Sequence, residues 1–473
     1  MREELLTPHV SSFVKSLRDI GYTFEVALAD LLDNCLTASA KNIEVYAISS
    51  PDPIVCILDD GLGMDATELK EAMRLATKDP ELERDDKDLG RFGLGLKTAS
   101  FSQCKLLTVI SKTKSSGLSV KQWDLKKVID SNEWLVNSLG VDELENIPLL
   151  DKLHGQESGT LVVWQKIDRI KYGSLATHLD HLNKHLSLVF HRFIDGFKNV
   201  RKVNILINDI PIKAFDPFNK TNASTLSEEE TPLKVKNVNI AVRPYILPPY
   251  TKTSSEEFEK YATSSGYSRS QGFYLYRADR LITYGTWWGL IKNQDANNLV
   301  RIQVDIPNSQ DDIWGITITK SGFGVTPPSS IRRDLRIICK EATRTGRGVI
   351  AGRSKAVKDK TETKYWQYLP GDNKYSFLIN REHPLLEEIR QEVSSESFQM
   401  ISIFLKGLEG YLPIESISRK LIHNPHEIKQ EKDITDEEIK ELISYLSDKG
   451  MSDDDVQRFI HSEGFVKEMF VDE

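Results

Sequence analysis

Two polar side chains spaced four residues apart stand out near the start of the chain. Apolar residues recur there at helical spacing and predict one buried face of a helix: Phe24, Leu28, Leu31 and Cys35. Asp30 and Asn34 then share the other face. A carboxylate and an amide oxygen on one helix face can orient a water molecule and hold one corner of a Mg²⁺ ion. An ordinary solvated helix carboxylate is the alternative interpretation of Asp30.

Two glycine-containing motifs follow. Asp59–Met64 comes after an apolar strand predicted over 54–58, and Asp59 can accept a hydrogen bond from an exocyclic amine such as that of adenine. Gly90–Lys97 precedes an apolar helix predicted over 94–101. The free amides and the dipole of a helix start favour phosphate. Together the three motifs predict an ATP site.

The order and spacing of these motifs resemble the GHKL superfamily of ATPases, which includes gyrase-type topoisomerases, heat-shock chaperones, histidine kinases and MutL proteins. The resemblance implies that ATP and Mg²⁺ are the cofactors, that Asn34 is the Mg²⁺ ligand, that Asp30 is the general base and that Asp59 binds adenine. The further nucleotide-binding residues that it implies are Gly61, Gly63, Met64, Gly90, Arg91, Phe92, Gly93, Leu94, Gly95 and Lys97. A solvated helix lysine is the alternative for Lys97.

Two positions depart from the commonest superfamily pattern. Asp30 stands where many members carry Glu and is one methylene shorter, so the helix or a lid must make up its reach. Thr37 replaces an Asp that often follows the Asn. We therefore expect ATP binding with slow hydrolysis.

Two further segments match the same resemblance. The highly charged stretch Lys78–Asp88 is typical of a surface loop and lies where the superfamily has its ATP lid. Ser158–Trp164 is an apolar strand entered through Gly-Thr, similar to the last nucleotide-domain motif, in which Thr160 would help to bind the adenine side. The nucleotide domain is predicted to end near residue 170.

Length and composition favour several folded domains. The 473 residues suffice for about three domains. With 39% hydrophobic and 28% charged residues, disorder is not expected. The sequence shows no apolar run of about 18 residues and no apolar signal-peptide core, so we expect a cytoplasmic protein without membrane contact. Its four cysteines lack Cys-x-x-Cys spacing, which favours buried thiols over a zinc site or disulfides.

The middle of the chain mixes strands and helices and resembles the transducer domain of topoisomerases and MutL proteins. A more specific pattern resembles microrchidia (MORC) ATPases and their bacterial relatives over about residues 10–345. It comprises His191-Arg192-Phe193, Asn208-Asp209, Phe215–Phe218 and a hairpin with Tyr276-Arg277-x-x-Arg280-Leu281-Ile282. Such families place a loop lysine against the γ-phosphate, and Lys320 is the candidate here. A solvent-facing strand-end lysine is the alternative.

The expected fold class is α+β in three parts. A GHKL-type α/β sandwich ATPase domain would occupy residues 1–170, and a ribosomal-S5-like transducer domain residues 171–345. A basic linker and a small helical C-terminal region would occupy residues 346–473.

Charge is uneven beyond this point. Arg332 to Lys364 holds eleven Lys or Arg against four Asp or Glu, whereas Glu427 to Glu473 holds fifteen acidic residues against six basic ones. The basic residues that would stripe a helix are Arg332, Arg333, Arg336, Lys340 and Arg344. Such a stripe can follow a DNA backbone without reading sequence. A solvated face, or pairing with the acidic tail, is the alternative, and that tail is also a candidate site for a protein partner.

The resemblance favours an ATP-driven switch that forms a homodimer on ATP binding and acts on DNA, with defence against foreign DNA suggested by the bacterial relatives. A chaperone-like switch that uses the same ATP cycle without touching nucleic acid is the alternative. A sensor histidine kinase is not favoured, because no phosphoacceptor helix pair fits before residue 20. The apolar-periodic segment 10–20 is either a packing helix or an arm that crosses to a partner subunit.

Overall fold

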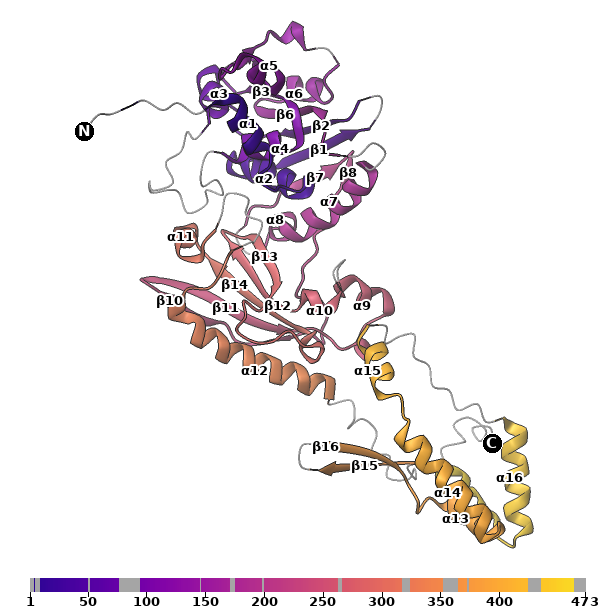
Figure 1. The fold of residues 1–473 in the computed structure, drawn as a ribbon. Coiled ribbons are helices and arrows are strands. Elements are labelled where there is room, and N and C mark those ends of the chain that lie inside the picture. The colour runs from indigo at the N-terminus through magenta and orange to yellow at the C-terminus, as the bar shows by residue number, and fades with distance from the viewer. Residues whose placement is uncertain are drawn as a thin grey trace. The chain divides into compact units, whose positions relative to one another are not determined.

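The computed structural model describes residue 4 and residues 9–49, 52–75, 94–144, 146–170, 175–197, 200–262, 266–316, 324–351, 365–371, 374–423 and 435–462. The chain divides into two compact units, Met1–Gly348 and Val349–Glu473. The first unit contains two sheets (Figure 1).

The first sheet has eight strands. In spatial order these are β5 (Asn137–Ser138), β4 (Ser119–Asp124), β3 (Cys104–Lys112), β6 (Gly159–Ile167), β2 (Ile54–Asp59), β1 (Asn42–Ile48), β7 (Asn204–Ile207) and β8 (Ile210–Pro211). Neighbours are antiparallel except β1 and β7, which are parallel. Because β7 joins this sheet, the first layer continues past residue 170.

Helices cover one face of the first sheet and bury most of its apolar side chains. They are α1 (Val10–Arg18), α2 (Phe24–Thr37), α3 (Ala66–Met73), α4 (Gly95–Gln103), α5 (Leu125–Ser131) and α7 (Leu175–Val189). The hydroxyl of Thr23 caps α2 by accepting from the Val26 amide at 3.3 Å. Val10 and Val14 of α1 are buried in this core, so residues 10–18 pack within their own domain. The opposite face carries a smaller apolar cluster under α6 (Leu150–Gly155).

The second sheet is mixed. Its main order is β10 (Thr231–Val235), β11 (Val238–Ile246), β14 (Val300–Ile306), β12 (Gly272–Arg277) and β13 (Arg280–Thr286), with β9 (Leu226–Ser227) beside β11. Strands β12 and β14 are parallel, and the other pairs are antiparallel. Short helices complete this region: α8 (His191–Asp195), α9 (Ser255–Ala262), α10 (Tyr267–Ser270) and α11 (Asp311–Trp314).

The long helix α12 (Arg332–Ala351) lies along the second sheet (Figure 1). Its apolar residues Leu335, Ile338, Cys339 and Ala342 are buried. A Cβ at Gly346 would lie 2.8 Å from Val300 of β14, so glycine permits this close packing. The basic stripe predicted from sequence is therefore on a helix with a buried apolar face.

The second unit is mainly helical. It contains the hairpin β15 (Trp366–Gly371) and β16 (Lys374–Ile379), followed by α13 (Pro384–Glu392), α14 (Ser395–Gly410), α15 (Ile414–His423), α16 (Asp436–Asp448) and α17 (Asp453–Ser462). Thr435 and Glu438 form the capping box at the start of α16, as their spacing predicts. Ile439 and Leu446 of α16 pack against Val456 and Ile460 of α17.

The α+β class predicted from the sequence is confirmed by these two sheets and their helices. Assignment of the second sheet to a ribosomal-S5-like transducer and division of the chain at residues 170 and 345 stay predictions. Within the part of the chain that the structure describes, no helix combines the length and the apolar character needed to span a bilayer.

Candidate active site

Helix α2 carries the carboxylate and the amide in different environments. Asp30 is 2% exposed, whereas Asn34, one turn later, lies at the exposed surface. The hydroxyl of Tyr22 donates to Oδ2 of Asp30 at 2.7 Å. Burial, followed by the nearby charge of Asp30, raises the pKa of Tyr22, so Tyr22 remains a neutral donor. Asp30 is thus an oriented buried carboxylate and not a solvated one.

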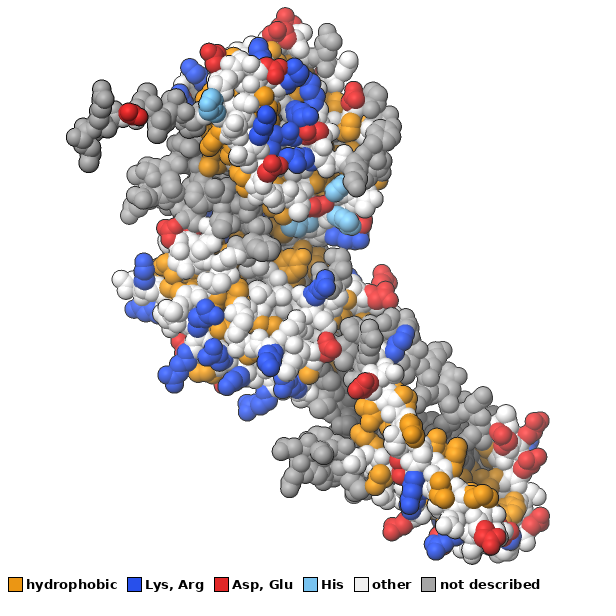
Figure 2. Space-filling view, viewed as in Figure 1, with side chains coloured by type: hydrophobic (Ala, Val, Ile, Leu, Met, Phe, Trp, Pro, Cys, Tyr) orange, Lys and Arg blue, Asp and Glu red, His pale blue; other side chains and the backbone are white. Residues whose placement is uncertain are grey.

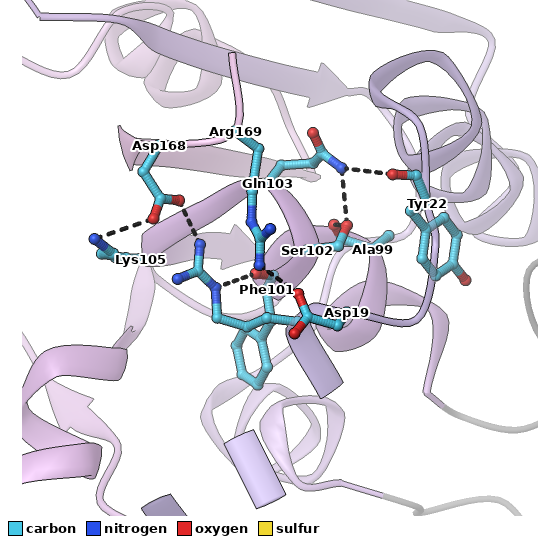
Figure 3. A network of polar contacts seen from close by, with 10 residues as sticks. Asp19, Tyr22, Ala99, Phe101, Ser102, Gln103, Lys105, Asp168 and Arg169 are labelled. Carbon is cyan, nitrogen blue, oxygen red and sulfur yellow. Dashed lines mark hydrogen bonds and ion pairs between the residues drawn. The ribbon is translucent and has the colours of Figure 1, made fainter. Parts of the chain in front are cut away.

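A polar network fixes the backbone that presents Tyr22 (Figure 3). Arg18 at the end of α1 pairs with Asp168 and donates to the Phe101 carbonyl at 2.9 Å. Asp19 accepts from Arg169 at 2.6 Å, and Gln103 donates to the Tyr22 carbonyl at 3.4 Å. These contacts tie the segment between α1 and α2 to the end of α4 and to the residues after β6.

The Asp59 motif forms a turn that has no room for side chains at its glycines. The Gly61 amide donates to Oδ1 of Asp59 at 2.8 Å. Gly63 has a φ of +70°, and a Cβ there would lie 1.8 Å from the Lys112 carbonyl oxygen. Burial raises the pKa of Asp59 to about 6, although the Gly61 amide partly offsets this. Asp59 is therefore a buried acceptor whose ionised form a further hydrogen-bond donor would stabilise.

The Thr160 motif lies directly beside this turn. Thr160 pairs with Asp59 across β6 and β2. The Ser111 hydroxyl lies 2.8 Å from the Thr160 hydroxyl and accepts from the Met64 amide at 2.9 Å. Three segments far apart in sequence are thus joined around Asp59 by hydrogen bonds.

The third motif is described only from Leu94 onward. Gly95 begins α4, and a Cβ there would lie 3.8 Å from Oδ2 of Asp30. Lys97 is buried, donates to the Ala72 carbonyl at 2.9 Å, and has its pKa lowered to about 8 by burial. Its predicted phosphate contact stays a prediction. Gly90, Arg91, Phe92, Gly93, Lys320 and the predicted lid at 78–88 lie outside the described residues.

Cys35 connects α2 with the Asp59 turn. The Cys35 thiol donates to the Leu31 carbonyl at 3.3 Å, and burial and the nearby charge of Asp59 raise its pKa. The Leu62 amide of the Asp59 turn donates to the carbonyl of Ala38, which caps α2, at 2.9 Å. Asn34 therefore lies on α2 between this link to the Asp59 turn and a carboxylate beside Gly95. The structure brings together Asp30, Asn34, Asp59, Gly61, Gly95 and Thr160.

Arg280 enters the site from the second sheet. Its Nε donates to Oδ1 of Asp33 at 3.0 Å, and its Nη2 lies 4.0 Å from Oδ1 of Asp30. Arg280, Asp30 and Asp33 have side chains that are 3%, 1% and 1% exposed. Burial and the positive charge of Arg280 lower the pKa of His185 on α7 to about 4, so this imidazole is neutral near pH 7.

The hairpin that carries Arg280 is held on several sides. Ala278 and Asp279 have φ of 46° and 67°, the left-handed values of a two-residue hairpin turn. Arg277 forms two hydrogen bonds of 2.7 Å with Asp311, and Arg192 of α8 lies 2.9 Å from Asp279. The Tyr276 hydroxyl lies 2.8 Å from Nε2 of His191.

Sequence reasoning missed the roles of Tyr22, Asp33 and Arg280. Asp33 lies in the first motif, and the hairpin pattern contains Arg280, so both were visible as residue types. The contact between them joins positions 247 residues apart, and a single sequence offers no signal for such a pair.

The residues present fit a nucleotide and a magnesium ion. Asn34 offers an exposed amide oxygen, and Asp59 offers a buried acceptor whose raised pKa leaves it responsive to a donor such as an exocyclic amine. Gly61 adjoins Asp59, and Gly95 adjoins Asp30 on the same helix as Asn34.

Comparison with known proteins gives the class of the domain. Residues 22–160 match the family described as "Histidine kinase-, DNA gyrase B-, and HSP90-like ATPase". These residues form a GHKL-type ATPase domain. Members of this class bind ATP with Mg²⁺, and the match to the class implies ATP hydrolysis.

More particular similarities point to MORC2 proteins. The chain is 31% identical over 94 residues to ATPase MORC2B and ATPase MORC2A of Mus musculus and to ATPase MORC2 of Homo sapiens. The matched segment is 19% of this chain and 9% of each relative. The similarity to MORC2 ATPases is therefore distant and local.

Proposed function

We propose that this protein is a Mg²⁺-dependent ATPase switch, in which nucleotide held in the first unit controls self-association and action on DNA. One observation carries the proposal. Helix α2 presents Asn34 between Asp30, which lies beside Gly95, and the capping residue Ala38, whose carbonyl accepts from the Leu62 amide of the Asp59 turn at 2.9 Å. Three sequence motifs thus converge on one helix within the GHKL-type domain.

The roles of the residues follow from their surroundings. Asn34 would hold Mg²⁺, whose charge offsets that of the nucleotide phosphates. Asp59 would accept a hydrogen bond from the adenine amine. Asp30 would take a proton from the attacking water, and Tyr22 fixes the orientation of its Oδ2. Slow hydrolysis is expected because Asp30 is shorter than glutamate.

Arg280 gives the second sheet a means of responding to the site. Its ion pair with Asp33 joins β13 to α2, one residue before Asn34. A change at α2 on nucleotide binding would therefore alter a buried contact of the second sheet. Lys320 as a γ-phosphate sensor remains part of the proposal.

Dimerisation and DNA contact have separate supports. The GHKL-type domain belongs to a class of ATPases that often dimerise, and the row of basic residues on α12 favours DNA contact. A chaperone-like switch without nucleic acid is the second candidate, and salt-sensitive binding of duplex DNA separates the two. A role in defence against foreign DNA, a cytoplasmic location and a protein partner for the acidic tail stay predictions of the sequence.

Light scattering after size-exclusion chromatography tests the switch. With Mg²⁺ and a non-hydrolysable ATP analogue, the full chain should double its mass, whereas Asn34→Ala should stay at the monomer mass. Unchanged mass with bound analogue would reject dimer switching alone. Failure to bind the analogue would reject the whole proposal.

A further inference from the structure

A basic groove lies on the second sheet's side of α12, well separated in sequence from the ATPase motifs. Its volume is about 470 Å³, and its charged lining comprises Lys292, Lys340, Arg344 and Arg347. Figure 2 shows Lys and Arg side chains gathered over α12. Lys292, Lys340 and Arg344 are exposed, so their ammonium and guanidinium groups are open to solvent.

One cation of the groove is held in place by hydrogen bonds to neighbouring side chains. Arg347 donates to Oδ1 of Asn297 at 3.1 Å and to Oε1 of Gln294 at 2.8 Å. Asn297 is 1% exposed. These partners are neutral amides, so they orient the guanidinium without cancelling its charge. Arg347 is thus fixed in place with its positive charge intact.

The groove cations have no acidic partner among the residues that the structure describes. No ion pair joins Lys292, Lys340 or Arg344 to a described carboxylate. Around the axis of α12, Glu341 lies about 100° and Asp334 about 120° from Lys340, since each residue turns about 100°. Asp295, on the loop that forms the wall, accepts from the Ser268 hydroxyl at 2.7 Å. The local positive charge is therefore available to an anion from outside.

The groove continues as a line of cations along α12. Five of them fall within a sector of about 80° around the helix axis, and they span about 21 Å; they are Arg333, Arg336, Lys340, Arg344 and Arg347. A single phosphate or a lipid headgroup is too short to meet all five. Successive positions four residues apart are about 6 Å apart along the axis, which suits a chain of regularly repeated phosphates.

We infer that this groove binds the phosphodiester backbone of duplex DNA. The groove lining contains no aromatic side chain among its described residues, so it offers no platform on which unpaired bases could stack. Binding would therefore depend on the duplex backbone and not on base sequence. This inference rests on the proposed action on DNA and assigns the surface that performs it.

The test compares two triple variants of the full chain with equal loss of charge. Lys292→Gln, Lys340→Gln and Arg344→Gln remove three positive charges from the groove. They leave Arg347 and its amide partners unchanged. Lys126→Gln, Lys152→Gln and Lys184→Gln form the control, since these lysines are at least half exposed and pair with carboxylates elsewhere. Fluorescence anisotropy with a labelled mixed-sequence 30-base-pair duplex, from low to high NaCl, gives affinity and salt slope.

The groove variant should lose on the order of 100-fold in affinity at 100 mM NaCl, and its salt slope should fall by about 2.7, for three lost phosphate contacts. The control variant should stay within about twofold of the parent. Both triple variants should keep the parental ATPase rate and melting temperature, which confirms that they are folded.

Three outcomes overturn the inference. If the parent and the groove variant bind duplex equally well, the groove is not the DNA-binding surface, while the proposed action on DNA stands. If the parent fails to bind duplex with or without ATP analogue, the groove and the proposed DNA action both fail, whereas measured ATP turnover still supports the ATPase. If single-stranded DNA or anionic vesicles bind the groove more tightly than duplex, the assigned ligand is wrong.

Discussion

Arginine serves different purposes in two regions of the first unit. Arg280 is 3% exposed and lies 3.0 Å from Asp33, with Asp30 at 4.0 Å. Arg344 is exposed on α12 and has no ion pair with any carboxylate of the described residues. Removing a guanidinium from water is costly, so a buried arginine needs neighbouring carboxylates to compensate its charge. An exposed arginine without such carboxylates can attract an anion from outside the protein.

The largest expected effect tests whether the buried region is catalytic or only an internal ion-pair cluster. Asp30→Asn removes the base but keeps the side-chain shape, so ATP turnover should fall by about 10² to 10⁴-fold. Binding of the ATP analogue should persist. Asp130→Asn, on the exposed face of α5, is the matched control. Turnover of Asp30→Asn at the parental rate would mean that the base is misassigned.

The comparison itself is tested by removing each arginine. Arg280→Met leaves the acids of α2 without their buried cation and should lower the free energy of unfolding by about 3–5 kcal/mol. Arg344→Met should change it by less than about 0.5 kcal/mol. Chemical denaturation of both variants provides the measurement. Equal losses would show that burial does not separate the two arginines.

Asp59 provides a pH test. Its pKa is raised to about 6, and a donor amine would lower it, so nucleotide binding should release a proton. Affinity should therefore fall by about fivefold between pH 6 and pH 5 and be nearly flat above pH 7. Nucleotide phosphates also change protonation in this pH range. The pH dependence of Asp59→Asn measures their contribution, which is subtracted from that of the parent. A difference between parent and variant that does not change with pH would contradict the adenine role.

The smallest effect concerns Tyr22. Tyr22→Phe removes one hydrogen bond to Asp30 and should cost about 1 kcal/mol of folding stability. It should also lower ATP turnover severalfold, because Oδ2 of Asp30 loses the donor that orients it. Phe24→Leu is the matched core change. Parental turnover in Tyr22→Phe would indicate that Tyr22 supports the fold only.

Local patterns explain why much of the site was visible in the sequence. The period of α2, the strand before Asp59 and the glycines of its turn are encoded within short segments, as is the apolar face of α12. The exposure of Asn34 beside buried Asp30 was not visible, because helical period alone places both on one face. The Arg280–Asp33 pair was missed because it depends on how two sheets pack. The hairpin Trp366–Ile379 was missed because Pro370 and Gly371 favour a turn. In the structure these two residues are instead the last two of β15.

Calorimetric titration of the full chain with a non-hydrolysable ATP analogue and Mg²⁺ shows whether α2 holds the metal-bound nucleotide. We expect one nucleotide bound per chain, a large loss of affinity in Asn34→Ala, and parental affinity in Arg344→Met. Parental affinity in Asn34→Ala would contradict it, because α2 would then not hold the metal-bound nucleotide.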